Sequence, residues 1–202
     1  PSEYGSYSNE MMSENNGDLT AFSKLLLGWI DPENVKIIKE GQDSIELEPS
    51  VDDGQCAIII PKYEEDKGLY TKFFIVDYAT YTGNDTSEIL TYEKNAGLRV
   101  YYVDATLNEE GKDFIHYNNS KDCALCPLIR QIHADGSEQH CSNMGSSNAK
   151  NNFIVTITNM YNDSHCNFRN GDKLSPYTIP SSKYITIGNE TFSGVTIDNI
   201  NL

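Results

Sequence analysis

The sequence lacks any apolar run of the roughly 20 residues that a membrane-spanning helix requires. It is also poor in basic residues, because 15 Lys and Arg stand against 30 Asp and Glu and give a formal net charge of −15. A charge of this sign repels phosphate backbones and anionic lipid surfaces. We therefore expect no membrane span and no nucleic-acid partner.

Several catalytic motifs are absent. The sequence has no H-E-x-x-H pair for zinc, no G-x-S-x-G nucleophile elbow and no G-x-x-x-x-G-K-[ST] phosphate loop. The four histidines are far apart in the sequence, and we interpret each as an ordinary surface or core residue: His116, His133, His140 and His165. The catalytic residues of a complete active site are not recognisable in this chain.

A short amphipathic helix is predicted near the start, over residues 18–28. Asp18 suits the N-cap position, and Gly28 and Pro32 are typical of the end of a helix. Large apolar residues follow the cap at helical spacing: Leu19, Phe22, Leu25, Leu26 and Trp29. We expect the only tryptophan to lie on the apolar face, packed on a sheet.

From residue 35 onward the apolar residues alternate in the manner of β-strands, with Gly, Asn, Asp and Pro turns between them. Nine runs show this pattern: 35–39, 44–48, 56–61, 69–81, 97–105, 127–136, 152–161, 183–188 and 194–200. They predict a mainly β chain folded as an antiparallel β-sandwich. The expected core comprises Ile58, Ile60, Phe74, Val76, Leu98, Val100, Val103, Ile129, Ile132, Ile154, Val155, Ile157, Val195 and Ile197.

The five cysteines allow three interpretations. A structural zinc ion could bind the C-x-x-C pair Cys123 and Cys126 together with Cys141 and Cys166, with His140 as an alternative to Cys166. In an exported protein, a disulfide could instead join Cys141 to Cys166. Free thiols are the third interpretation. Cys56 is part of neither the zinc candidate nor the disulfide candidate.

Acidic residues suggest one further metal. Calcium binds Asp and Asn oxygens, which occur at 82–85 (TGND) and at Asp104. The sequence shows no ordered D-x-D-x-D-G loop, so calcium stays an alternative to ordinary solvated loops.

The opening motif combines Met11, Met12 and Ser13 with the segment SKLLLGWI (23–30). Four further motifs follow along the chain: NAGLRVYYVDA (95–105), IHADG (132–136), NGDKLSPYTIPSSKY (170–184) and SGVTIDNI (193–200). Together, these five motifs resemble the immune inhibitor A-like family of secreted bacterial zinc metallopeptidases (peptidase family M six), in which a methionine-bearing turn precedes such a helix. Departures are Glu10 in place of Asp, Tyr102 in place of His, and a cysteine-containing stretch at 118–126.

The resemblance implies the role of this chain. Residues 1–32 would be the end of a catalytic domain and residues 33–202 an accessory β-sandwich of a secreted or cell-surface hydrolase. Met11 or Met12 would lie beneath the zinc ion as an apolar floor. The zinc helix is missing and would precede Pro1, so the upstream catalytic segment is the expected partner. Protein substrates belong to the parent enzyme, and the chain alone is expected to be inactive.

Two alternatives come from other functional classes. The chain could be an extracellular binding module for protein or glycan, since its thirteen tyrosines suit contact surfaces as well as strands. A cluster of exposed tyrosines on one sheet face would favour this interpretation, whereas tyrosines dispersed into the core would remove the case that their number makes for it. The chain could also belong to an inactive pseudo-peptidase, from which these residues do not distinguish an active parent.

Overall fold

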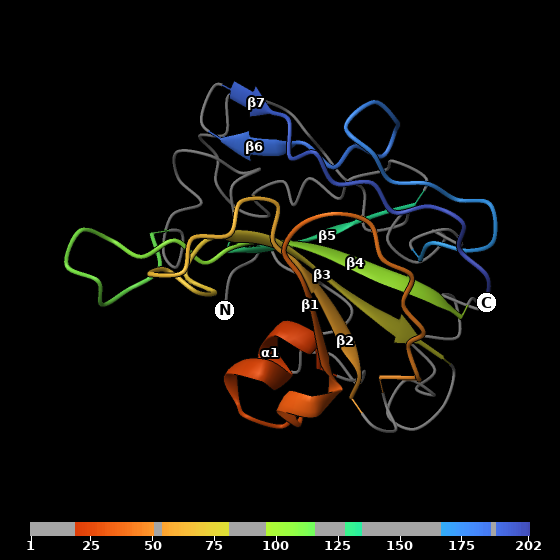
Figure 1. Ribbon diagram of the computed structural model, residues 1–202, viewed down its shortest axis with the longest axis horizontal. Helices are drawn as coiled ribbons and strands as arrows, with labels where there is room; N and C mark the ends of the chain where they lie inside the picture. Colours follow the sequence, from red (N-terminus) through yellow and green to blue (C-terminus); the bar gives the residue numbers. More distant parts are fainter. Residues whose placement is uncertain (1–18, 51–53, 81–95, 116–127, 135–166, 187–188) are drawn as a thin grey trace, which may run out of the picture.

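The structure, a computed structural model, describes residues 19–50, 54–80, 96–115, 128–134, 167–186 and 189–202 (Figure 1). Its helices are α1 (Ala21–Leu26) and the short 3-10 helix η2 (Pro32–Asn34). Its strands are β1 (Val35–Ile38), β2 (Cys56–Ile59), β3 (Lys72–Ala79), β4 (Gly97–Asp104), β5 (Ile129–Ile132), β6 (Tyr184–Thr186) and β7 (Asn189–Thr191). Neither helix in these ranges is long and apolar enough to cross a membrane.

The central element is an open five-stranded sheet with strand order β1-β2-β3-β4-β5. Strands β2 to β5 are antiparallel, but β1 and β2 run parallel, so the prediction of a purely antiparallel sheet is wrong. The long segment 39–55 lets the chain return to the same end of the sheet before β2 begins, as a parallel pair requires. The mainly β prediction is confirmed, whereas the described residues do not confirm a sandwich.

The runs of alternating residues became strands only in part. The run at 44–48 forms no strand, although its Ile45 and Leu47 pack against the core. The run at 194–200 contributes an isolated bridge between Leu174 and Ile197 instead of a strand. The run at 152–161 lies outside the described residues. Alternation alone therefore identified apolar segments more reliably than paired strands.

Helix α1 is shorter than predicted and begins later. Its N-cap is Thr20, not Asp18, and the Thr20 side chain accepts a hydrogen bond from the Ser23 N–H. The predicted stop at Gly28 is confirmed. Gly28 has φ of 69°, and the Gly28 and Trp29 N–H groups donate to the carbonyls of Leu25 and Lys24. This pair of bonds is the Schellman arrangement, which favours glycine at its left-handed position.

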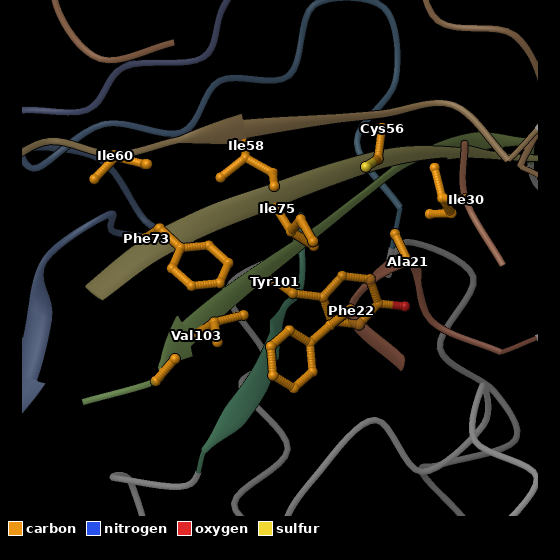
Figure 2. Close-up of a cluster of buried hydrophobic side chains, with 11 residues drawn as sticks. Ala21, Phe22, Ile30, Cys56, Ile58, Ile60, Phe73, Ile75, Tyr101 and Val103 are labelled. Atoms are coloured by element: carbon orange, nitrogen blue, oxygen red, sulfur yellow. The ribbon is translucent and has the colours of Figure 1, made fainter. Parts of the chain in front are cut away.

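The two faces of the sheet are covered by different parts of the chain (Figure 1). Helix α1 lies on one side, and the C-terminal segment, residues 167–186 and 189–202, lies on the other. On the α1 face, Phe22 packs with its ring centroid 6.3 Å from that of Phe73. Figure 2 shows Phe22 and Ala21 beside Tyr101 of β4. On the opposite face, Phe168 and Leu174 join the cluster built around Phe74 and Tyr102.

The C-terminal segment reaches β4 at a point where only glycine fits. Leu98 and Phe168 exchange backbone hydrogen bonds of 2.8 and 2.9 Å. A Cβ on the neighbouring Gly97 would lie 2.7 Å from Asn167 Cβ and 2.9 Å from the Phe168 carbonyl oxygen. Gly97 therefore permits the close approach that seats the C-terminal segment on the sheet.

Most of the predicted core is confirmed. The following predicted residues are buried: Ile58, Ile60, Phe74, Val76, Val100, Val103, Ile132 and Val195. Leu98, Ile129 and Ile197 are partly buried at its margins. Ile154, Val155 and Ile157 lie outside the described residues. Because both faces of the sheet are covered, neighbouring residues of the central strands that the prediction left out are buried as well: Phe73, Ile75, Tyr101 and Tyr102.

Candidate functional site

Most of the site residues predicted from the sequence lie outside the described ranges. These are the methionines Met11 and Met12, the calcium candidate 82–85, and the zinc or disulfide candidates Cys123, Cys126, His140, Cys141 and Cys166. The zinc, disulfide and methionine-floor assignments therefore stay predictions. Of the four histidines, His133 falls within the described residues, where it is buried just after β5.

Asp104, the other calcium candidate, is buried at the end of β4. Its Oδ1 accepts hydrogen bonds from the Thr106 hydroxyl and backbone N–H, and its Oδ2 lies 3.5 Å from Lys72 Nζ. Across the described ranges, no group of three or more His, Cys, Asp or Glu is arranged to hold a metal ion. The geometry thus gives Asp104 a local structural role, capping the turn after β4.

A buried charge cluster, formed by Lys24, Ser50, Asp77 and Arg99, joins α1 to the sheet. Arg99 Nε and Nη2 donate to the two carboxylate oxygens of Asp77 at 2.6 and 3.0 Å. Arg99 Nη2 also donates to Ser50 Oγ at 2.8 Å, while Lys24 Nζ donates to the Ser50 carbonyl oxygen at 2.8 Å. All four residues are at most 8% exposed. The cluster links four segments that are distant in the sequence: α1, the loop at Ser50, β3 and β4.

The same cluster also holds the first turn of α1. Asp77 Oδ2 accepts a hydrogen bond of 3.3 Å from the Ala21 N–H, one of the groups that a helix leaves without an internal partner. Asp77 lies on β3 and Arg99 opposite it on β4, so the strand register holds the two side chains together. The Asp77 carboxylate thus serves both its partner Arg99 and the start of α1.

Cys56 is the register partner of Asp77 on β2 and is fully buried. Burial, followed by the nearby Asp77 charge, raises the pKa of the Cys56 thiol to about 12. The reactive thiolate is consequently scarce at neutral pH.

We expect Cys56 to resist iodoacetamide in the native protein at pH 8 and to react in urea, as measured by peptide mass spectrometry. Labelling of the native Cys56 peptide as fast as the unfolded one would contradict this environment.

Exposed apolar side chains lie at the C-terminal end of α1 and just after it. We call this group, formed by Leu26, Leu27 and Trp29, the α1 apolar surface. These side chains are 60%, 55% and 63% exposed. The prediction that Trp29 packs on the sheet is therefore wrong. The helix ends at Leu26 and the chain reverses at Gly28, which turns Trp29 away from the face that Phe22 buries. Three large apolar side chains are thus exposed within four residues, which makes this end of the helix a candidate contact surface.

A second exposed group, the apolar patch, consists of Tyr177, Ile179 and Phe192. Tyr177 and Ile179 are each 87% exposed, and Phe192 is 58% exposed. The rings of Tyr177 and Phe192 lie 5.4 Å apart between centroids and are tilted by 39°. Lys183 Nζ lies 5.3 Å from the Phe192 ring centroid. The patch belongs to the C-terminal segment and therefore lies on the sheet face opposite α1.

The tyrosines are dispersed among different environments. Tyr101 and Tyr102 are fully buried, Tyr70 is 55% exposed, and Tyr177 is almost fully exposed. The described residues thus show no sheet face covered by exposed tyrosines. Exposed aromatic side chains occur at three places in these ranges: Trp29 after α1, Tyr70 before β3, and the apolar patch, where Tyr177 meets Phe192. The distribution of tyrosines therefore does not support a binding module.

Sequence reasoning missed the buried charge cluster. The signal was present, because Asp77 and Arg99 each interrupt an otherwise apolar or aromatic strand, in FFIVDYA and GLRVYYV. A charged residue in such a run is expected to be paired when the strand is buried. What the sequence did not indicate was that Lys24 and Ser50 complete the set, since those contacts depend on how α1 docks.

Comparisons with known proteins match nothing: no protein family, curated protein or solved structure is found to be similar to this chain. The function therefore has to be inferred from the residues and the geometry described above.

Proposed function

We propose that this chain is the C-terminal, non-catalytic part of a secreted, zinc-dependent endopeptidase of the immune inhibitor A-like type. The observation that carries the proposal is the way in which α1 is held, since the family-like segment SKLLLGWI (23–30) overlaps the second half of this helix. The buried charge cluster fixes this helix to the sheet, while its far end exposes Leu26, Leu27 and Trp29. A rigidly held helix with an apolar end suits a support for another protein segment.

The role of the chain's own residues would be positioning. The sheet holds α1, and α1 follows the methionine-bearing turn by a few residues, so the orientation of Met11 and Met12 would depend on the helix. The metal ligands and the general-base glutamate would come from the upstream segment. When bound there, zinc supplies a water activated for attack on a peptide carbonyl.

The proposal is tested with two proteins: the chain alone, and the same chain extended upstream to the start of its coding sequence. We expect zinc-dependent hydrolysis of fluorescent casein by the extended protein, abolished by chelation, and none by the chain alone. Casein hydrolysis by the pure chain would contradict the proposal that the catalytic residues lie upstream of it. A well-folded extended protein without activity would point to a pseudo-peptidase or to a binding module.

The role of the α1 apolar surface is tested in the extended protein. We expect Leu26→Ser combined with Trp29→Ser to lower casein hydrolysis by at least about tenfold, because two interface anchors are lost. Tyr70→Ser is the matched control, since Tyr70 is a similarly exposed aromatic at 55%. Thermal unfolding of the isolated chain should be nearly unchanged in both variants. Equal activity of the two variants would remove the case for an interface at α1.

A second candidate function is supported by the apolar patch. An extracellular module that binds protein or glycan needs an exposed contact surface, and Tyr177, Ile179 and Phe192 form one on the opposite side of the sheet from α1. Large exposed apolar groups that lie together are uncommon on proteins without partners. The two candidates are compatible, because each uses a different face of the molecule.

A further inference from the structure

An asparagine followed by a glycine forms the tip of an exposed turn in the C-terminal segment. This pair of residues occurs twice in the sequence, at 16–17, outside the described residues, and at Asn170–Gly171. Both residues of the second pair are exposed. Because glycine has no Cβ, its main-chain nitrogen can approach the amide of the preceding asparagine closely. The pair therefore meets the first requirement for reaction of a side-chain amide with its own main chain.

The turn that carries this pair is closed by two hydrogen bonds. The Asp172 N–H donates to the Arg169 carbonyl oxygen at 2.9 Å, and the Arg169 N–H donates to Asp172 Oδ2 at 2.8 Å. Gly171 has φ of 90°, the left-handed value that the third residue of a type II turn adopts. The second residue of such a turn is extended, which directs the following nitrogen away from its side chain. The closed turn thus keeps the Gly171 nitrogen apart from the Asn170 amide carbon.

A third hydrogen bond holds the Asn170 side chain itself. Asn170 Oδ1 accepts a hydrogen bond of 2.7 Å from the Leu202 N–H. Because an N–H group needs an acceptor, this bond also determines that the oxygen of the amide, and not its nitrogen, faces Leu202. The side chain that would have to swing toward Gly171 is therefore tied to the last residue of the C-terminal segment.

The turn lies between two points at which the C-terminal segment is anchored. Before it, Phe168 exchanges backbone hydrogen bonds with Leu98 of β4, and after it, Leu174 exchanges them with Ile197. Phe168 and Leu174 are both fully buried. A main chain lengthened between these two anchors could not close the same turn.

We propose that Asn170–Gly171 is a modification site, at which the Asn170 amide is lost and the main chain isomerises when the turn opens. The Gly171 nitrogen attacks Asn170 Cγ and closes a cyclic imide, and Nδ2 leaves as ammonia with the proton of the Gly171 N–H. Water then opens the imide at one of its two carbonyl carbons, which gives aspartate or isoaspartate. The three hydrogen bonds of the closed turn hold the reaction back, because they withhold the geometry of attack.

The two products affect the structure differently. Aspartate keeps an acceptor oxygen for the Leu202 N–H and adds one negative charge. Isoaspartate places an additional methylene group in the main chain, so the turn cannot re-form and the contact with Leu202 is lost. The inference is independent of both candidate functions, since the reaction needs only this chain and water.

The test follows the purified chain at pH 8, in buffer and in urea, by mass spectrometry of the tryptic fragment 170–173, in which Asn170 is the only asparagine. We expect loss of the amide to be at least about tenfold faster in urea than in buffer, because unfolding opens the turn. Leu202→Pro removes the donor to Asn170, and Asp172→Ala removes the acceptor of the Arg169 N–H. Each substitution should speed the reaction severalfold in buffer and leave the rate in urea nearly unchanged.

Asn199 is the matched internal control, because it is also exposed but is followed by Ile200, whose β-branched side chain crowds the attacking nitrogen. We expect Asn199 to keep its amide in both conditions. Loss of the amide from Asn199 as fast as from Asn170 in urea would overturn the assignment of the site. Equal rates at Asn170 in buffer and in urea, or unchanged rates in buffer for both variants, would overturn control by the turn. Circular dichroism confirms that each variant is folded in buffer.

Discussion

Replacement of Asp77 by asparagine is expected to destabilise the protein by about 3–5 kcal/mol, because it removes one partner of a buried ion pair. The side chains of Arg99 and Asp77 are 2% and 0% exposed, so water cannot replace the lost carboxylate. The Ala21 N–H at the start of α1 loses its charged acceptor at the same time. The free energy of unfolding, measured in urea for the chain and for D77N, gives the size of the effect.

A matched control is available at the surface. Asp198 pairs with Lys173 at 3.2 Å, but both side chains are more than 40% exposed. The same substitution there, Asp198→Asn, should change the free energy of unfolding by less than about 1 kcal/mol. If D77N costs no more than D198N, the buried charge cluster does not hold the structure together, and the way in which α1 is fixed to the sheet would need another explanation.

Replacement of Phe22 by alanine is expected to cost about 3–5 kcal/mol, the usual range for deletion of a buried aromatic side chain. Phe22 is 6% exposed and packs against Phe73. Alanine has a higher helix propensity than phenylalanine, so a loss of stability reports packing and not local helix formation. Urea unfolding measures the global effect, and hydrogen exchange of the α1 amides shows whether the helix separates from the sheet first.

The control for Phe22 lies on the same helix. Leu26 is 60% exposed, and Leu26→Ala should change the free energy of unfolding by no more than about 0.5 kcal/mol. A similar cost for both variants would mean that the two sides of α1 are equally buried in solution. In that case the α1 apolar surface would not be available to another protein segment.

Together, these experiments distinguish the residues that attach α1 to the sheet from the residues of α1 that stay exposed for contact with another segment. Asp77 and Phe22 attach the helix to the sheet by charge and by packing. Leu26 and Trp29 lie on the part that remains exposed. Variants of the first kind should affect stability, whereas variants of the second kind should affect only the activity of an extended protein. A support domain of the proposed type requires both kinds of residue.

The end of α1 was predicted correctly from local sequence, whereas its beginning was not. Gly28 ends α1 because a left-handed residue completes the two terminal hydrogen bonds, and glycine adopts that conformation without strain. The N-cap was misplaced because Asp18 and Thr20 are both good capping residues. Only the packing of Phe22 on the sheet places Thr20 where the helix begins.

The amino-acid sequence by itself determined the apolar segments, the mainly β character and part of the core, since these follow from residue type and period-two spacing. Tertiary structure alone decided the parallel pairing of β1 with β2, the exposure of Trp29, and the meeting of Lys24, Ser50, Asp77 and Arg99. These features depend on which segments meet after the chain has folded back on itself. No spacing within one segment encodes such contacts, because their energies arise only between segments that are distant in the sequence.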